Sequence, residues 1–300
     1  MKNLIRISTV LMVAFVFHSC KTVDLRTDYV KNEPAQTAEE KGRQLLADAS
    51  KKMGYDKLEN TEVYETTANF KWKGLWPLMP MNSLPGNLNK DIQFRFATNS
   101  FDGQVKYLEG RKEGLVQGLQ SWEGYKIKRN NGELKRHEHD RYIWGLATYH
   151  YLVEAPMTMK DAEIVRYAGE KEFDGKTFET VYVTWGTEEP NKQYDRFLVY
   201  VNKDTGFIDM AELTIGDFYL PMPKGMQHAT VQWDREMASN GTYLPSMTYI
   251  QLGKPKDKSK YVYKYASKDY KFDSFPKSEL YPIEGLKDFG TSKKFTNDQM

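Results

Sequence analysis

From Glu62 onward, apolar and polar residues alternate along short segments, and this period of two limits what the chain can fold into. Apolar side chains occupy every second position around Phe70 and Trp72, Ile92 to Phe96, Phe178 to Tyr182, Phe197 to Val201 and Tyr243 to Tyr249. Successive side chains of a β-strand point to opposite faces, so the pattern predicts strands with a buried face.

Turn sequences separate these segments, as in Asp102-Gly103, Asn130-Asn131-Gly132, Asp174-Gly175, Lys203-Asp204-Thr205-Gly206 and Ser239-Asn240-Gly241. Asn-Gly and Asp-Gly pairs supply the positive φ values of tight hairpins. No regular alternation of strands with helices accompanies them, so we predict a mainly β (α+β) fold. Its core is a strongly curved antiparallel sheet, or half-open barrel, with an N-terminal helix and an inserted helix.

Two segments have the spacing of helices instead. In residues 37–53, Leu45, Leu46, Ala49 and Met53 fall on one helical face. Thr37 and Glu40 have the spacing of a capping box, and Gly54 is suited to end the helix. A second helix is predicted from Arg141 to Val153, ending before Pro156.

The N-terminus has the features of an export signal. Lys2 and Arg6 precede an uncharged apolar run from Ile7 to Phe17, which is too short to span a bilayer but suits a signal peptide. The small residue Ser19 before Cys20 resembles the lipobox that is cleaved in bacterial lipoproteins. We therefore predict lipid attachment at Cys20. Lipoproteins of this type often stay in the inner membrane when Asp follows the cysteine; here Lys21 follows, which favours the outer membrane.

Cysteine and charge counts narrow the possible partners. Cys20 is the single cysteine of the chain, so no internal disulfide can form. The chain has 43 basic and 41 acidic residues, and removal of residues 1–19 takes away two basic ones, Lys2 and Arg6. The mature protein then has no formal net charge, so we expect no binding to nucleic acid.

The domain organisation follows from these features. We predict a signal peptide at 1–19, a lipidated polar tether at 20–35, a single half-barrel-like domain at 36–283 and a polar tail at 284–300. We expect a monomer.

Two proline-rich loops interrupt the strand pattern and are apolar, although loops are normally polar because they lie on the surface. They span residues 74–85 and 216–225. An apolar loop packs over the sheet, covers a cavity, touches a membrane or binds another protein. The predicted ligand-binding or membrane-contacting residues are Leu75, Trp76, Leu78, Met79, Met81, Leu84, Leu220 and Met222.

His137 and His139 are the candidates for a metal site, because alternate residues of a strand share a face. They lie in a run of charged residues, and no third ligand follows at a diagnostic spacing. We therefore predict no metal and no other cofactor.

Catalytic motifs are not evident. The sequence lacks GxSxG, HExxH and a phosphate-binding glycine loop. We expect a protein that is not an enzyme.

The order of elements, with the motifs Tyr167-Ala168-Gly169-Glu170, Asp174-Gly175-Lys176, Val181 to Trp185, Tyr194-Asp195-Arg196-Phe197 and Asn202 to Gly206, is similar to a family of Bacteroidota outer-membrane lipoproteins. That family resembles the lipoprotein-localisation-factor superfamily, and the resemblance covers roughly residues 37–275. It implies a half-open barrel around an apolar cavity that accepts acyl chains.

These observations lead to two alternatives. The first is a lipoprotein of the cell envelope, anchored in the outer membrane on its periplasmic or outer face, that binds a lipid or acyl chain in a half-barrel cavity. The second is a structural or partner-binding lipoprotein with a filled core. A hollow of several hundred Å³ would favour the first alternative.

Overall fold

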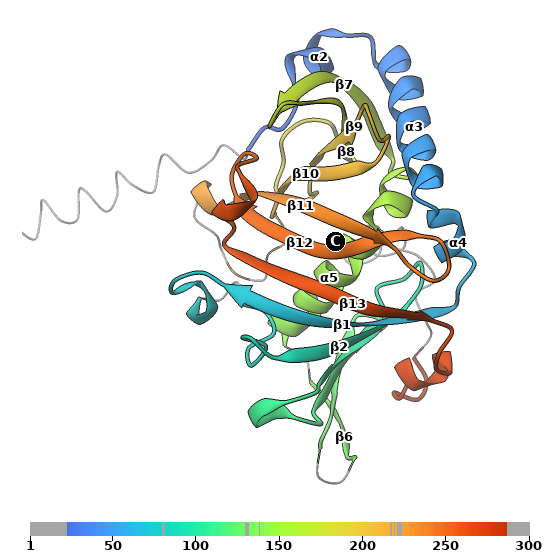
Figure 1. Ribbon diagram of the computed structural model, residues 1–300, viewed down its shortest axis with the longest axis vertical. Helices are drawn as coiled ribbons and strands as arrows, with labels where there is room; N and C mark the ends of the chain where they lie inside the picture. The colour runs from blue at the N-terminus through green and yellow to red at the C-terminus, as the bar shows by residue number, and fades with distance from the viewer. Residues whose placement is uncertain are drawn as a thin grey trace, which may run out of the picture.

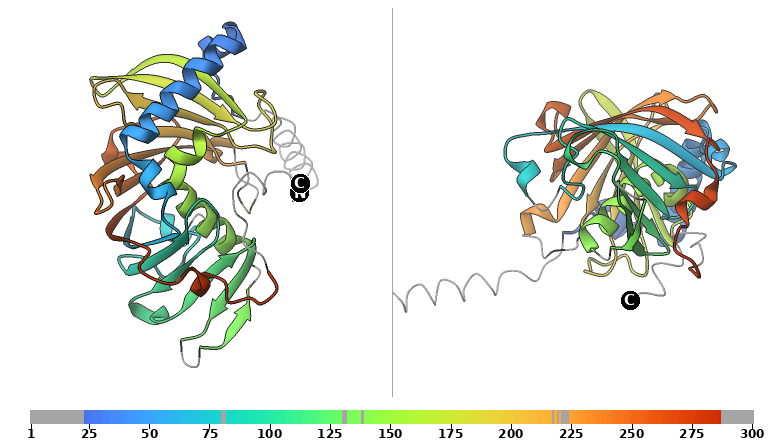
Figure 2. Two further views of the ribbon diagram at one scale, coloured as in Figure 1. Left: turned by 90° about the vertical axis from the view of Figure 1, so that its right-hand side faces the viewer. Right: turned by 90° about the horizontal axis from the view of Figure 1, so that it is seen from below.

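A computed structural model of the protein describes residues 23–79, 82–129, 132–137, 139–216, 218, 220 and 224–286. The predicted lipid site Cys20 and the loop residues Met81 and Met222 lie outside these ranges. Within them, thirteen strands form one antiparallel sheet in the order β6-β5-β4-β3-β2-β1-β13-β12-β11-β10-β9-β8-β7. The sheet is curved and its two outermost strands do not pair, which confirms the predicted half-open, mainly β fold (Figures 1 and 2).

Most neighbouring strands in the sheet are also neighbours in sequence, as a meander requires. The exception is β1, which pairs with both β2 and β13 and so joins the first half of the sheet to the last strand. The strands are β1 (Val63–Trp72), β2 (Asp91–Ala97), β3 (Gly103–Tyr107), β4 (Val116–Gln120), β5 (Glu123–Ile127), β6 (Leu134–Arg136), β7 (Ile164–Phe173), β8 (Lys176–Thr184), β9 (Phe197–Asn202), β10 (Ile208–Thr214), β11 (His228–Met237), β12 (Tyr243–Leu252) and β13 (Tyr263–Phe272).

The short helical elements lie between the strands or next to the long helices. They are α2 (Asp28–Asn32), α4 (Tyr55–Glu59), η1 (Trp76–Leu78), η2 (Gly110–Lys112), η3 (Lys224–Met226), η4 (Lys258–Lys260) and η5 (Lys277–Leu280).

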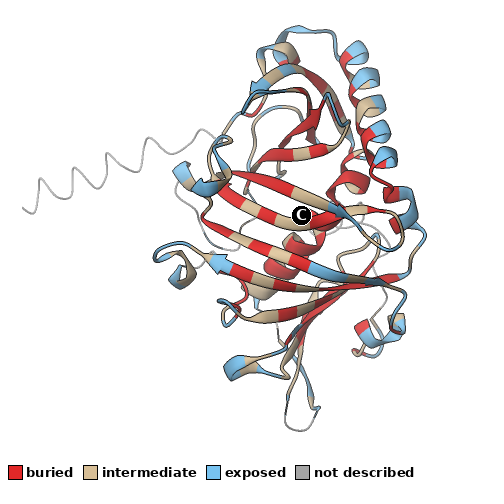
Figure 3. Cartoon of the chain, in the orientation of Figure 1, coloured by how far each residue is buried: buried red, intermediate tan, exposed pale blue. Residues whose placement is uncertain are grey.

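The alternation seen in the sequence sets which side chains face the core. In β1, Tyr64, Ala68 and Phe70 are fully buried in the main hydrophobic cluster, and Ile92 and Phe94 of β2 join them. Figure 3 shows the buried positions recurring along the strands of the central sheet. The period of two therefore places one continuous apolar face against the helices.

Of two predicted hairpin turns, the structure has one at the predicted residues and the other at a different position. Asp174 and Gly175 both have positive φ, at 51° and 72°, as predicted for the turn between β7 and β8. The predicted turn at Asp102-Gly103 is displaced: Gly103 is the first residue of β3, and Asn99 has the left-handed φ of 59°. Asn tolerates this conformation better than most residues, so it takes the position expected of glycine.

The long helix α3 (Ala35–Lys52) packs on β7, and its buried residues Leu46 and Ala49 belong to the main hydrophobic cluster. The helix ends as predicted, with Met53 followed by Gly54 at a φ of 77°. The start differs from the capping-box prediction. Pro34 precedes the first helical residue, so Thr37 lies within the helix and makes no cap; proline has no N–H to donate and its φ suits a helix start.

The second long helix, α5 (Asp140–Met159), contains Pro156, although the predicted helix ended before that residue. Proline removes one backbone hydrogen bond of the helix. Ala155, Met157 and Met159 are nevertheless buried in the main cluster, so tertiary packing holds the last turn in helical form.

The segment before α3 was predicted as part of a polar tether, and the structure differs from this prediction. Leu25 and Val30 are buried in a second hydrophobic cluster with Tyr182 and Tyr200. These tyrosines alternate with Val181 and Val199, which belong to the main cluster. Strands β8 and β9 are therefore covered on both faces, by α3 on one and by the N-terminal segment on the other.

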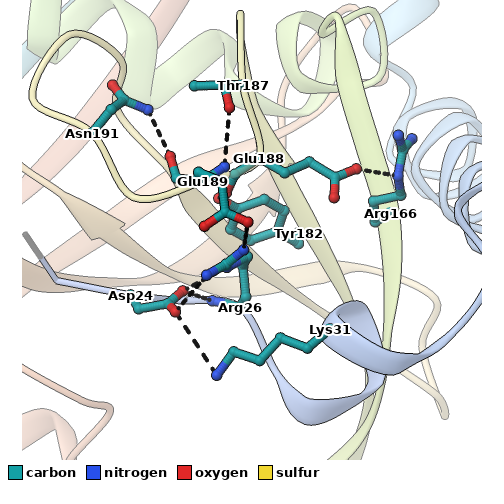
Figure 4. A network of polar contacts seen from close by, with 9 residues as sticks. All are labelled: Asp24, Arg26, Lys31, Arg166, Tyr182, Thr187, Glu188, Glu189 and Asn191. Carbon is teal, nitrogen blue, oxygen red and sulfur yellow. Dashed lines mark hydrogen bonds and ion pairs between the residues drawn. The ribbon is translucent and has the colours of Figure 1, made fainter.

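An ion pair joins this segment to the loop between β8 and β9 (Figure 4). Arg26 pairs with Asp24 at 3.0 Å and also with Glu189. Glu188 of the same loop is held by two strands: its Oε1 lies 2.5 Å from Arg166 Nε of β7, and its carbonyl accepts from the Tyr182 hydroxyl of β8 at 2.9 Å. The packing of this segment on the sheet could not be predicted from the sequence, because Leu25 and Val30 do not recur with the period of a strand or a helix.

Candidate functional site

The first apolar loop, residues 74–85, leaves the end of β1 and turns through η1. Leu75 and Leu78 are 76% and 80% exposed, and Met79 is 42% exposed. Trp76 is partly buried and packs against the main hydrophobic cluster. The loop therefore has an anchored tryptophan between two leucines that are open to solvent, as expected for an apolar contact surface.

Residues 82–84 of this loop lie in the interior. Leu84 is fully buried in the main cluster, so it packs in the core and is not part of the exposed surface formed by Leu75 and Leu78. Ser83 fits closely against α5: a Cβ added at Gly145 would lie 2.6 Å from Ser83 Cβ. Glycine is required there because the loop and the helix approach so closely.

The second apolar loop, residues 216–225, reaches the same half of α5. The rings of Trp144 and Phe218 meet edge to face, with their centroids 4.8 Å apart and an interplanar angle of 86°. Leu220 is 42% exposed. Both loops thus border the N-terminal half of α5, and we call Leu75, Trp76, Leu78, Met79, Trp144, Phe218 and Leu220 the apolar loop pair.

Aromatic rings occupy the space between α5 and the sheet behind the loop pair. The ring centroid of Tyr149 lies 5.2 Å from Phe70, 5.5 Å from Phe94 and 5.6 Å from Tyr265. Burial raises the pKa of Tyr149 to about 12, so its hydroxyl remains neutral.

A small cavity lies further along α5. It has a volume of about 10 Å³ and is lined by Asn99, Ser100, Phe101, Tyr151, Glu154 and Thr158. This is room for about one water molecule, not for an acyl chain.

The two histidines considered as metal ligands lie close together at the start of α5. Their ring centroids are 5.9 Å apart, and His139 Nδ1 accepts a hydrogen bond from the Arg141 backbone N–H at 3.3 Å. His139 therefore caps the helix. His150, another potential ligand, is buried and bonded to Glu154. No group of three metal-binding side chains occurs among the residues that the structure describes.

Several residues at the loop pair escaped the sequence prediction. Arg141 and Trp144 lie in the predicted second helix without an assigned role, and Lys112 belongs to no predicted motif. Lys112 and Arg141 belong to the site because the fold brings them to the first apolar loop. Lys112 contacts the carbonyl of Pro85, and Arg141 contacts the carbonyl of Asn82. The site thus combines an apolar surface with two adjacent cations.

No helix in the described part of the chain is long and apolar enough to cross a membrane.

Comparisons with known proteins give similarities in structure. No family model and no curated protein matches the chain. A DUF1329 family protein from Desulfovibrio piger is 11% identical, with 83% of this chain and 99% of that chain covered and a TM-score of 0.48. A LolA superfamily protein from Nitrosomonas europaea is also 11% identical, with 83% and 97% covered and a TM-score of 0.45.

A domain from Vibrio parahaemolyticus, described as an outer membrane lipoprotein-sorting protein, is 8% identical, with 81% of this chain and 97% of that chain covered and a TM-score of 0.46. At this level of similarity these structures assign neither a ligand nor an activity to the chain.

Proposed function

We propose that the protein is a non-enzymatic lipoprotein of the bacterial cell envelope, anchored through Cys20, that binds the acyl chain of a lipid at the apolar loop pair. The observation that carries this proposal is the exposure of Leu75 and Leu78, at 76% and 80%, beside a partly buried Trp76. Holding leucines in water costs free energy unless a partner covers them, at roughly 25 cal/mol per Å² of apolar surface.

The geometry favours a binding place at the mouth of the half-barrel. Tyr149 and its neighbouring rings fill the space beneath the loops, so the acyl chain lies along Trp76, Trp144 and Phe218. Aromatic side chains offer large, rigid apolar contacts with little loss of entropy. Met79 adds an adaptable side chain that suits ligands of variable shape.

The test is native mass spectrometry of the full chain, purified from membranes, before and after organic extraction. A covalent lipid on Cys20 survives the extraction, whereas a bound lipid is lost. We expect a stoichiometric, extractable adduct that weakens in the variant Leu75→Ser/Leu78→Ser.

The matched control is Met237→Ser, which replaces a 65% exposed apolar residue at the far end of β11 and should leave the adduct unchanged. Absence of any extractable adduct from the folded wild-type protein would instead support a structural or partner-binding lipoprotein.

A further inference from the structure

Two cationic side chains from different elements contact the backbone of the first apolar loop. The Lys112 ammonium, at the end of η2, donates to the Pro85 carbonyl. The Arg141 guanidinium, in the first turn of α5, donates through Nε to the Asn82 carbonyl at 2.9 Å and through Nη2 to the same oxygen. Both positive charges therefore lie against the short stretch from Asn82 to Pro85.

No carboxylate in the described part of the chain forms an ion pair with either cation. Among the described residues, neither Lys112 nor Arg141 has an Asp or Glu oxygen within 4.0 Å, whereas Arg26, Arg95 and Arg166 are each paired. Around Lys112 lie the rings of Tyr107 and Tyr142 instead, with centroids 4.8 and 5.6 Å from its ammonium.

The surroundings of Lys112 are electropositive. Burial, followed by repulsion from Arg141, lowers the pKa of Lys112 to about 8. The pKa of His137 is also lowered, first by burial and then by Lys126, His139 and Lys112. Like charges held close together in a partly buried place attract an anion.

A buried amide without partners lies just beyond the first apolar loop, at Asn87. Asn87 is fully buried, and its side-chain oxygen and nitrogen have no hydrogen-bond partner in the structure. Its neighbour Gly86 packs on the stem of Lys112, whose Cδ would lie 3.1 Å from an added Cβ. Buried polar groups are nearly always paired, and this unpaired amide follows directly after the glycine that packs on Lys112.

We propose that Lys112 and Arg141 bind the anionic group, a phosphate or carboxylate, of an amphiphile whose apolar part lies on the apolar loop pair. This inference rests on the proposed function and specifies its ligand class. Arg141 and Trp144 are one helical turn apart on α5, and residues at that spacing lie on the same side of a helix. The cation that would bind the anionic group and the ring that would bind the chain are thus adjacent.

The test compares palmitate with hexadecanol by isothermal titration on the full chain. The two have the same number of carbons, but the head group is an anionic carboxylate in palmitate and a neutral hydroxyl in hexadecanol. We expect wild type to bind palmitate at least about tenfold more tightly, since charge-assisted hydrogen bonds are the strong ones. The variant Lys112→Gln/Arg141→Gln should lose this preference and keep its affinity for hexadecanol.

The control variant Lys51→Gln/Lys176→Gln removes two exposed lysines elsewhere and should keep the preference. Equal wild-type affinities for palmitate and hexadecanol would overturn the anion site and leave the proposed function standing. That comparison needs no variant, so it decides the question even if the double variant does not fold. Binding of neither amphiphile would refute the proposed function itself.

Inorganic phosphate alone is the third probe. No phosphate binding at concentrations where palmitate saturates the protein supports recognition of an amphiphile. Saturable phosphate binding that Lys112→Gln/Arg141→Gln abolishes would overturn the amphiphile and assign the site to free anions.

Discussion

The indole of Trp144 and the ring of Phe218 meet edge to face at 4.8 Å, and this contact links α5 to the second apolar loop. Aromatic pairs of this geometry contribute about 0.5–1.5 kcal/mol beyond the area they bury. We predict that Trp144→Ala weakens binding of an acyl-chain ligand by about tenfold, since the variant also removes contact surface. Titration with hexadecanol measures the loss, and an unchanged affinity would exclude Trp144 from the binding surface.

Leu84 and Leu75 lie in the same loop but should respond differently to truncation. Leu84 is fully buried and Leu75 is 76% exposed. We predict that Leu84→Ala lowers the free energy of unfolding by about 2–5 kcal/mol, whereas Leu75→Ala changes it by less than about 0.5 kcal/mol. Urea denaturation of the two variants compares them directly. Similar losses would contradict the division of this loop into a core part and an exposed part.

His150 and Glu154 form a buried hydrogen bond, with Nε2 and Oε1 2.8 Å apart, one turn from each other on α5. Glu154 also accepts from the Asn99 backbone N–H at 3.1 Å. We predict that Glu154→Leu destabilises the protein by about 1–3 kcal/mol, because the buried His150 ring and the partly buried Asn99 N–H both lose their hydrogen-bond partner.

Glu154→Gln keeps an acceptor oxygen and should cost clearly less. Thermal unfolding of the two variants measures which is the less stable, and we expect this to be Glu154→Leu. If Glu154→Gln is as destabilised as Glu154→Leu, the hydrogen bonds do not explain the stability of this pair.

The charge of Lys112 should make anion binding depend on pH. Its pKa is lowered to about 8, so the side chain is charged below that pH and neutral above it. We predict that affinity for hexadecane sulfonate, whose charge does not titrate in this range, falls by up to about tenfold from about pH 7 to pH 9. The variant Lys112→Gln should show a flat profile, and a flat profile in wild type would contradict the role of Lys112.

The strands and the end of α3 could be predicted because residues close together in the sequence determine them. Alternation in β2 and β9 and the glycine at position 54 depend on neighbours in sequence. The errors at α5 and at the N-terminal segment have tertiary causes. Burial of Met157 and Met159 continues the helix beyond Pro156, and the cluster around Tyr182 and Tyr200 covers Leu25 and Val30.

The apolar character of the site could also be predicted, but its assembly could not. Trp76 and Phe218 lie far apart in the sequence, and only the folded sheet brings their loops to the same half of α5. The same holds for Lys112 and Arg141, whose proximity depends on two carbonyls of the first loop. No period or motif in the sequence encodes such contacts.

Photo-crosslinking with a palmitate that carries a diazirine at the end of its chain is the most direct test of the central claim. The full chain is irradiated with the probe, digested, and the labelled peptides are mapped by mass spectrometry. We predict labelling within residues 74–79, at Phe218 or Leu220 and around Trp144. Excess unlabelled palmitate should abolish this labelling by competition. Specific labelling confined to other parts of the sheet, or none that palmitate displaces, would contradict binding at the apolar loop pair.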